Sequence, residues 1–166
     1  MTGIYGKLAS LWRPRPPVLR PNRIGDAAEC ARLHRESFRH GWSVEDFQRF
    51  SIDKQTLGHV AHPHGQSSLH GAIFSRMAAD EAEILTIMVA KAARNQGLGR
   101  QLLMRHLAEL ASLGTHHLFL EVEAGNKPAL ALYQRFYFRQ VGERPGYYAG
   151  ADGKKSSALL LRCDFH

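Results

Sequence analysis

Apolar residues recur along this chain of 166 residues with two different periods. A period of two predicts half-buried strands over 83–89 and 118–121, whereas leucines at helical spacing predict a long amphipathic helix from Leu98. A second helix is predicted from 127, where Pro128 is tolerated because the first N–H groups of a helix have no internal partner. A strand, a loop and a helix therefore follow one another twice in the second half of the chain.

The N-terminal half carries elements of the same kinds. Residues 18–24 are predicted to form a first strand, Asp26 to cap a helix, and 27–38 to form that helix. A second, shorter helix is expected to open at Ser43. Residues 62–68, rich in proline, glycine and serine, predict a turn between two strands.

Two glycines lie at the junction between the strand at 83–89 and the helix that follows it. The first backbone N–H groups of a helix have no internal partner, and glycine lets an anion approach them closely. The junction lacks the lysine of a P-loop and the third glycine of a dinucleotide site. It predicts a pyrophosphate site, unless the glycines serve only a tight turn. The run is Arg94-Asn95-Gln96-Gly97-Leu98-Gly99-Arg100.

The pattern Arg-x-x-Gly-x-Gly in this run resembles the acetyl-coenzyme A loop of the GNAT N-acetyltransferases. From 80 to about 161, roughly half of the chain, the sequence is similar to the RimI-type ribosomal-protein N-alpha-acetyltransferases in several separate motifs. These are Gln96-Gly97-Leu98-Gly99-Arg100, Leu120-Glu121-Val122, Asn126, Ala131-Leu132-Tyr133, Tyr147-Tyr148 and Asp152-Gly153.

The resemblance implies a fold and a reaction. The fold is an α/β (α+β) GNAT domain, with a mixed, mostly antiparallel sheet flanked by helices and opened at one edge. Acetyl-coenzyme A is the implied co-substrate, without a metal, and the implied partner is a protein N-terminus. The favoured acceptor is the N-terminal alanine of a small-subunit ribosomal protein, acetylated directly in a ternary complex.

Glu121 resembles the family's general base, Tyr133 its general acid and Asn126 its cofactor-binding asparagine. The chemistry needs such groups, because an N-terminal amine with a reference pKa of about 8 is largely protonated at neutral pH and a departing thiolate accepts a proton. Glu123 lies on the same strand face and is an alternative base. Tyr133 is alternatively a core aromatic side chain.

The resemblance also assigns the contacts with acetyl-coenzyme A. The end of the strand at 83–89 is expected to pair through its backbone with the amides of the pantetheine arm, and to diverge from its neighbour to admit the thioester. The residues expected to bind the cofactor are Ile87, Met88, Val89, Arg94, Asn95, Gln96, Gly97, Leu98, Gly99, Arg100, Asn126 and Tyr133.

Phe38, Trp42, Glu45, Asp46 and Tyr147 are the candidates for contact with the acceptor. In the family, the region of the first two helices borders the acceptor groove, and an acidic wall suits a cationic amine. The alternative is that the tryptophan fills the core and the two acids cap a helix.

Some positions depart from the family's pattern. Phe136-Tyr137-Phe138 stands where leucine-glycine-phenylalanine is usual, so a bulky residue occupies a position that favours a positive φ. Ala149 replaces the usual proline after the tyrosine pair, and Ser156-Ser157 replaces a usual acidic residue. These departures bear on the choice of acceptor more than on acetyl transfer.

The formal net charge is +7, and a basic, proline-rich arm over 1–17 contributes three of these charges. This arm is expected to be flexible, and 18–166 to form a single domain. A basic chain permits a ribosome or RNA partner, so a non-catalytic RNA-binding module is one alternative, although direct nucleic-acid binding is not favoured. Acetylation of small amines or lysine side chains is another.

Cys30 and Cys163 lack the spacing of a disulfide scaffold or a metal site, and are expected to be reduced thiols. The adjacent His116 and His117 point to opposite faces of a strand, and no zinc set surrounds them. A membrane-spanning helix needs about 20 consecutive apolar residues, and no stretch of this sequence comes close to that length. No signal peptide is expected. We expect a cytoplasmic protein without a membrane partner.

Overall fold

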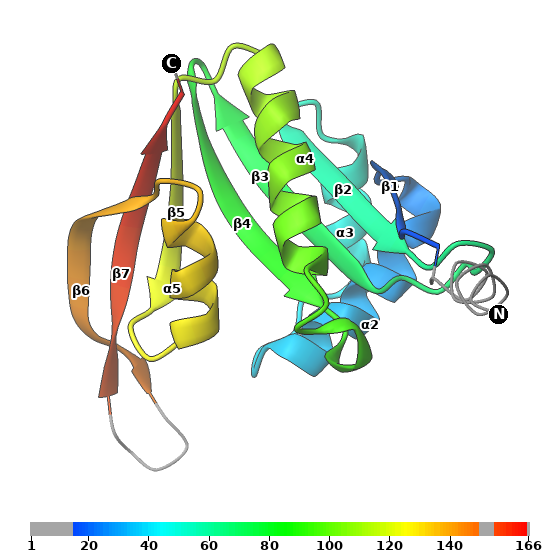
Figure 1. Cartoon of the computed structure of the whole chain (residues 1–166), viewed down its shortest axis with the longest axis horizontal. Coiled ribbons are helices and arrows are strands. Elements are labelled where there is room, and N and C mark those ends of the chain that lie inside the picture. The colour runs from blue at the N-terminus through cyan, green and yellow to red at the C-terminus, as the bar shows by residue number, and fades with distance from the viewer. Residues whose placement is uncertain (1–14, 150–154, 166) are drawn as a thin grey trace, which may run out of the picture.

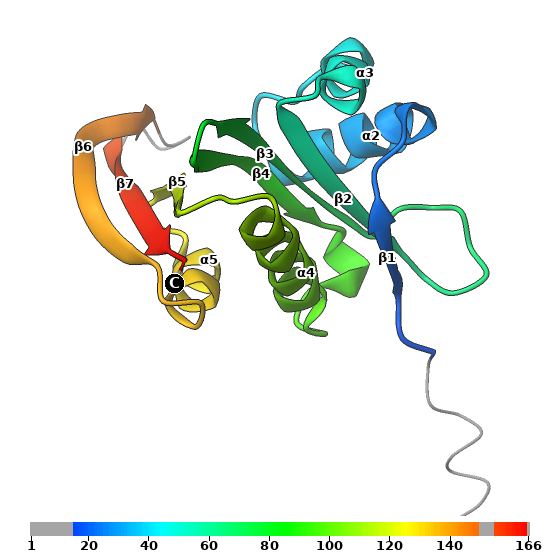
Figure 2. The same cartoon turned by 90° about the horizontal axis from the view of Figure 1, so that it is seen from above.

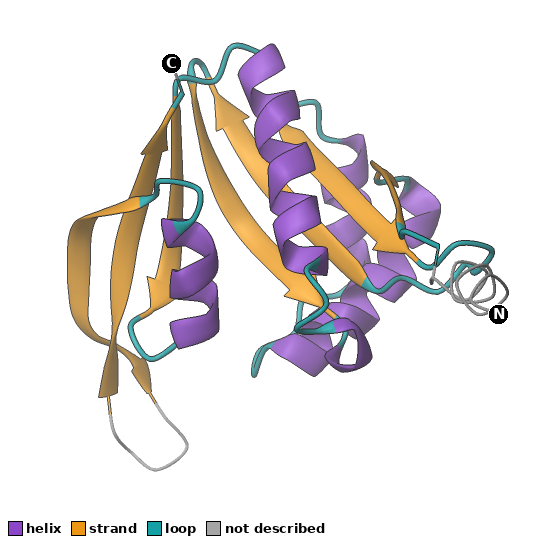
Figure 3. Ribbon diagram, in the orientation of Figure 1, coloured by secondary structure: helices purple, strands orange, loops and turns teal. Residues whose placement is uncertain are grey.

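The computed structural model describes residues 15–149 and 155–165. These residues form a sheet of seven strands with helices on both faces (Figures 1 and 3). The strand order is β1-β2-β3-β4-β5-β7-β6, and β4 and β5 are the one parallel pair among these strands. The prediction of a mixed, mostly antiparallel sheet flanked by helices is confirmed. Asp152-Gly153 and most of the predicted arm at 1–17 lie outside the described residues.

The elements follow the predicted order. The strands are β1 (Val18–Pro21), β2 (Thr56–His62), β3 (Gly71–Ala78), β4 (Glu81–Val89), β5 (His117–Glu123), β6 (Arg139–Ala149) and β7 (Lys155–Asp164). The helices are α2 (Ala27–Ser37), α3 (Val44–Ile52), α4 (Leu98–Ser112) and α5 (Lys127–Gln134), with short 3-10 turns η1 (Ile24–Asp26) and η2 (Lys91–Ala93).

The first strand ends earlier than predicted, at Pro21. The carboxylate of Asp26 accepts the Arg23 N–H at 2.8 Å and two hydrogen bonds from Arg20, which closes η1 directly after the strand. Asp26 still precedes α2, but its side chain makes no capping hydrogen bond to that helix, so the predicted cap is wrong in this respect. By contrast, Ser43 caps α3 as predicted, through a reciprocal capping box.

Two hydrophobic cores lie on opposite faces of the sheet (Figure 2). Helix α4 covers one face, and its leucines pack against β3, β4, β5 and β7. Helices α2 and α3 cover the other face over β2, β3 and β4. The fully buried side chains of the second core include Leu33, Phe47 and Phe74.

Strand β4 changes its partners along its length. Its pairing with β3 passes from Ile84 to Thr86, so Leu85 forms a β-bulge that exchanges the faces to which the following side chains point. Its pairing with β5 ends at Ile84 opposite Leu120, and the two strands then diverge (Figure 1). The predicted divergence of this strand is confirmed.

The end of α5 keeps a left-handed conformation without glycine. Tyr137 has φ 62° and is 88% exposed, and its N–H donates to Gln134 O at 3.1 Å. Phe138 N–H then donates back to Tyr133 O at 3.2 Å. The helix end therefore has the geometry that glycine favours, at a cost of about 1–2 kcal/mol in backbone strain.

Candidate active site

The loop between β4 and α4 is held by its own side chains. Arg94 Nε donates to Val89 O at 3.0 Å, and Gln96 Nε2 donates to Ala92 O at 2.8 Å. Asn95 and Gly97 both have positive φ, at 60° and 80°. The side chains thus fix the shape of the loop and leave its backbone to face outward.

A run of backbone amides in this loop has no protein acceptor. Within the described residues, the N–H groups from Asn95 to Arg100 donate to no oxygen, and Gln101 is the first to donate, to Gly97 O at 3.1 Å. Gly97 is the N-cap of α4 and has no side chain to satisfy them. Consecutive free amides at the positive end of a helix are suited to an anion, and binding of a pyrophosphate there stays a prediction.

Gly99 leaves this site open without being required by packing. A Cβ placed there would lie 3.6 Å from Val89 Cγ2 and 3.7 Å from Leu132 Cδ2, which are ordinary contacts. The protein itself would tolerate a methyl group, so the bare backbone leaves space for a ligand. The same distances show that the ends of β4, α4 and α5 converge at this point.

The end of β4 offers backbone rather than side chains. Ile87, Met88 and Val89 pair with β3 on one edge and have no β5 partner on the other. Met88 is 1% exposed and belongs to the core, and Val89 O already accepts a hydrogen bond from Arg94. The backbone groups that remain on the free edge are therefore available for the contacts predicted for these residues.

Glu121 lies immediately past the last pair between β4 and β5. Its side chain is 23% exposed, and its Oε1 lies 3.1 Å from Nη2 of Arg144 on β6. Burial and the charge of this carboxylate raise the pKa of Tyr148 above its usual range, as do Tyr147 and Glu123. Glu123, the alternative base, is exposed at the end of β5.

Tyr133 lies on α5 and is buried in the hydrophobic core, 5% exposed, with its ring 5.5 Å from that of Phe138. Burial raises the pKa of its hydroxyl to about 12, so the group stays protonated at neutral pH. Asn126 caps α5, because its Oδ1 accepts the Ala129 N–H at 3.2 Å. The asparagine oxygen therefore has a structural partner, and the amide nitrogen remains for a ligand.

Two of the five candidates for acceptor contact, Phe38 and Trp42, belong to an aromatic cluster between α2 and α3. Trp42 stacks on His34 at 4.4 Å, and Phe38, 42% exposed, lies 4.5 Å from the same ring. Burial lowers the pKa of His34 to about 4, so this ring is neutral near pH 7. These contacts fit the alternative in which the tryptophan fills the core.

The two acids of α3, Asp46 and Glu45, have different surroundings. Asp46 accepts the Ser43 N–H at 2.9 Å and pairs with Arg49, which matches the capping alternative. Glu45 is exposed beside it. Tyr147 is 57% exposed, and the Arg144 guanidinium lies 5.7 Å from its ring centroid. Tyr147 is therefore the acceptor candidate that lies near Glu121, because it contacts the arginine that pairs with this carboxylate.

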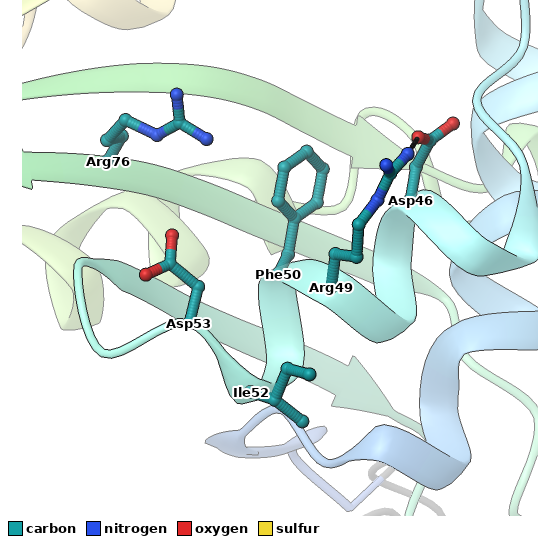
Figure 4. A pocket seen from close by; sticks show the side chains of 6 residues that line it. All are labelled: Asp46, Arg49, Phe50, Ile52, Asp53 and Arg76. Carbon is teal, nitrogen blue, oxygen red and sulfur yellow. Dashed lines mark hydrogen bonds and ion pairs between the residues drawn. The ribbon is translucent and has the colours of Figure 1, made fainter.

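A shallow pocket lies between α3 and β3. Figure 4 shows the ring of Phe50 between the side chains of Arg49 and Arg76. Of the predicted acceptor contacts only Asp46 lines this pocket, and neither Glu121 nor Tyr133 does. The pocket is lined by Asp46, Arg49, Phe50, Ile52, Asp53 and Arg76.

Sequence patterns gave no sign of Arg144 or Tyr148 as neighbours of Glu121. Both lie on β6, two strands away from β5, and no local period links them to the carboxylate. The described residues contain no group of three or more His, Cys, Asp or Glu side chains that could hold a metal ion, and no helix among them is long and apolar enough to cross a membrane. Cys30 and Cys163 are free and buried.

The sequence profile of the acetyltransferase (GNAT) family matches residues 27–138. The ribosomal protein bS18-alanine N-acetyltransferase of Escherichia coli is 38% identical over 81 residues, 49% of this chain and 55% of that protein. The match thus spans about half the length of this curated relative. The N-alpha-acetyltransferase RimI of Mycobacterium tuberculosis is 35% identical over 134 residues, 76% of this chain and 82% of that protein.

Solved structures share the fold. The crystal structure of the ribosomal-protein-S18-alanine N-acetyltransferase from Escherichia coli has a TM-score of 0.82 at 26% identity, covering 90% of this chain and 94% of that chain. Arabidopsis thaliana NAA60 in complex with acetyl-CoA has a TM-score of 0.77 at 22% identity, covering 90% of this chain and 99% of that chain.

Proposed function

This chain belongs to the acetyltransferase (GNAT) family, and we propose that it transfers the acetyl group of acetyl-coenzyme A to the α-amine of a protein N-terminus. One observation carries the proposal. The amides from Asn95 to Arg100 have no protein acceptor, and Glu121 lies at the point where β4 and β5 cease to pair. The carboxylate thus lies where β4 and β5 begin to diverge, and the free amides follow the end of β4, beyond the diverging part of that strand.

The loop and the strand edge hold the co-substrate. The free amides of 95–100 receive the pyrophosphate, because they supply hydrogen bonds and the positive end of α4. The backbone of 87–89 pairs with the pantetheine arm as an added strand would. The amide nitrogen of Asn126 is available to the same ligand from α5.

Glu121 acts as the general base and Tyr133 as the general acid. The carboxylate takes a proton from the acceptor ammonium through a water, which frees the lone pair that attacks the thioester carbonyl. Tyr133 is protonated at neutral pH, since burial raises its pKa to about 12, and it donates to the departing thiolate. Transfer is direct, from one bound substrate to the other.

The acceptor proposed in detail is the N-terminal alanine of a small-subunit ribosomal protein. The support comes from the relatives, whose names specify the alanine of ribosomal protein S18 as their substrate. Such a partner would place this chain in the cytoplasm. Residues 18–166 would act as one catalytic domain, with 1–17 as an arm.

The test measures thiol release from acetyl-coenzyme A. The acceptor is a short peptide that begins with alanine, and the control is the same peptide acetylated at its N-terminus. We expect release only with the free peptide. Equal release with the blocked peptide would assign a side-chain acceptor instead. Salt-sensitive RNA binding without any acetyl transfer would favour the non-catalytic alternative.

A further inference from the structure

Arg144 reaches the candidate base from two strands away. It pairs with Ala158 on β7, which in turn pairs with Glu123 on β5. The side chain of Arg144 reaches across β7, and its Nη2 lies 3.1 Å from Oε1 of Glu121. The contact therefore ties β6 to β5 over the strand between them.

A β-bulge directly after Arg144 shapes this contact. The β6–β7 register passes from Arg144 opposite Ala158 to Tyr148 opposite Ser156, so β6 has two more residues than β7 over this interval. Gly146 lies within the bulge with φ 63°. Bulges redirect side chains near active sites. This one brings the ring of Tyr147 to 5.7 Å from the guanidinium and to 5.2 Å from the ring of Tyr148.

Stability alone does not account for the ion pair. The Arg144 side chain is 63% exposed, and an exposed pair contributes only about 0–1 kcal/mol to folding. Its geometry has a different consequence. One carboxylate oxygen of Glu121 is occupied, so the other is left to face a water or an amine. A base held by a third group in this way is the usual arrangement in activated catalytic pairs.

We propose that Arg144 is a positioning residue, which fixes the carboxylate of Glu121 so that its second oxygen accepts the proton of the acceptor amine. The proposal rests on the proposed function. Arg144 touches neither substrate in this role and acts only through Glu121. The ring of Tyr147 packs near the guanidinium, at 5.7 Å from its centroid.

The test separates turnover from binding. We expect Arg144→Gln to lower kcat about tenfold, because misplacing a catalytic group slows the chemical step, and to change either KM less than about twofold. Arg144→Lys should recover part of kcat, since it keeps the charge but not the planar fork. Arg135→Gln, an exposed arginine on the same half of the molecule, is the matched control and should leave kcat unchanged.

A double-mutant cycle decides whether Arg144 acts through Glu121. In the Glu121→Gln background, Arg144→Gln should have no further effect on the residual single-turnover rate. Additive losses would overturn the proposal, as would a raised peptide KM at constant kcat. Equal melting temperatures of Arg144→Gln and the parent chain would support it, and a loss of kcat explained by unfolding would overturn it.

The contact also has a readout that needs no turnover. The Arg144 Nε–H signal in a ¹H–¹⁵N spectrum should shift in Glu121→Gln and stay in place in Glu123→Gln. If the parent chain acetylates no acceptor, the proposed function fails by itself. If the parent chain acetylates an N-terminus but the Arg144 signal does not shift in Glu121→Gln, only the proposed role of Arg144 fails.

Discussion

The sheet has a covered half and an open half, divided where β4 and β5 diverge. Strands β3 and β4 contribute to the cores on both faces, beneath α4 on one side and α2 and α3 on the other. Among the described residues, β5 and β7 contribute only to the α4 core. The opposite face of the open half has no helix over it (Figure 2). Leu120 and Val122 belong to the α4 core, so Glu121 between them points to this opposite face. The covered half is therefore packed on both faces, whereas the open half is packed on one.

Polar groups differ between the halves in the same way. In the covered half, His59 Nδ1 and His106 Nδ1 lie 2.9 Å apart, and His106 Nε2 lies 2.7 Å from Ser75 Oγ, all fully buried. In the open half, Asp164 forms ion pairs with Arg139 and Arg162, and its Oδ1 lies 2.8 Å from Nδ1 of His117. Buried neutral rings and exposed charges respond differently to substitution and to pH, and this difference can be measured.

The largest effect should follow a change in the open half. Glu121→Gln should lower kcat by about 10²–10⁴-fold, the usual contribution of a general base, while the urea midpoint stays close to that of the parent chain. Thiol release measures the first quantity and urea unfolding the second.

Glu123→Gln is the matched control for this change, two residues along the same strand face. It should retain nearly full turnover, because Glu123 lies beyond the divergence and is exposed. If the two variants exchanged their phenotypes, Glu123 would be the base. Unfolding of Glu121→Gln in mild urea would show that the open half also carries stability.

Acid should destabilise the covered half first. Burial lowers the pKa of His34 to about 4 and of His106 to about 3, below the ordinary value of 6.5. The unfolded chain binds these protons before the folded chain does, so stability is lost as pH falls below about 6.5. The loss reaches about 2 kcal/mol per histidine by pH 5, measured by urea unfolding at several pH values.

Asp164 in the open half should respond to acid at a lower pH than these histidines. The hydrogen bond from His117 lowers the pKa of Asp164 below its usual range, so the stabilisation that this carboxylate provides is lost as pH falls below about 4. His106→Gln removes one titrating ring and should flatten the pH dependence between 6.5 and 5. An unchanged slope in this variant would show that His106 is protonated in the folded state.

Local patterns predicted the parts of the site that local rules govern. The glycine loop, the capping box at Ser43 and the helix at Pro128 follow from propensity and from unpaired N–H groups over a few residues. The divergence of β4 followed from resemblance, since no local period contains it. Sequence therefore located the loop, the base candidate and the order of the elements.

Long-range register governs the rest. The contact of Arg144 with Glu121 depends on the pairing of β6 with β7, including a bulge, and the contact of His59 with His106 joins residues 47 apart. The sequence leaves open whether Trp42 contacts an acceptor or fills the core, and its stacking on His34 fits the second alternative. Such contacts arise from packing between elements, which a single sequence does not show.

A smaller loss of turnover should follow removal of the Tyr133 hydroxyl. Tyr133→Phe should lower kcat about ten- to hundredfold, less than Glu121→Gln, because a thiolate with a pKa of about 8.5 leaves readily without a proton donor. The ring is retained, so stability should change by less than about 1.5 kcal/mol. Phe138→Leu, which alters packing against the same ring, should instead lower stability more than turnover.

The smallest effect should follow the relief of backbone strain, which can be compared between the two halves. Tyr137 in the open half and Ala79 in the turn after β3 both have positive φ, at 62° and 55°. Tyr137→Gly and Ala79→Gly should each stabilise the fold by about 1 kcal/mol, the cost of a left-handed residue with a Cβ, read as a higher urea midpoint. Tyr137 is 88% exposed, so removing its ring sacrifices little packing. If Tyr137→Gly lowered turnover while Ala79→Gly did not, the strained tyrosine would belong to the function of the open half.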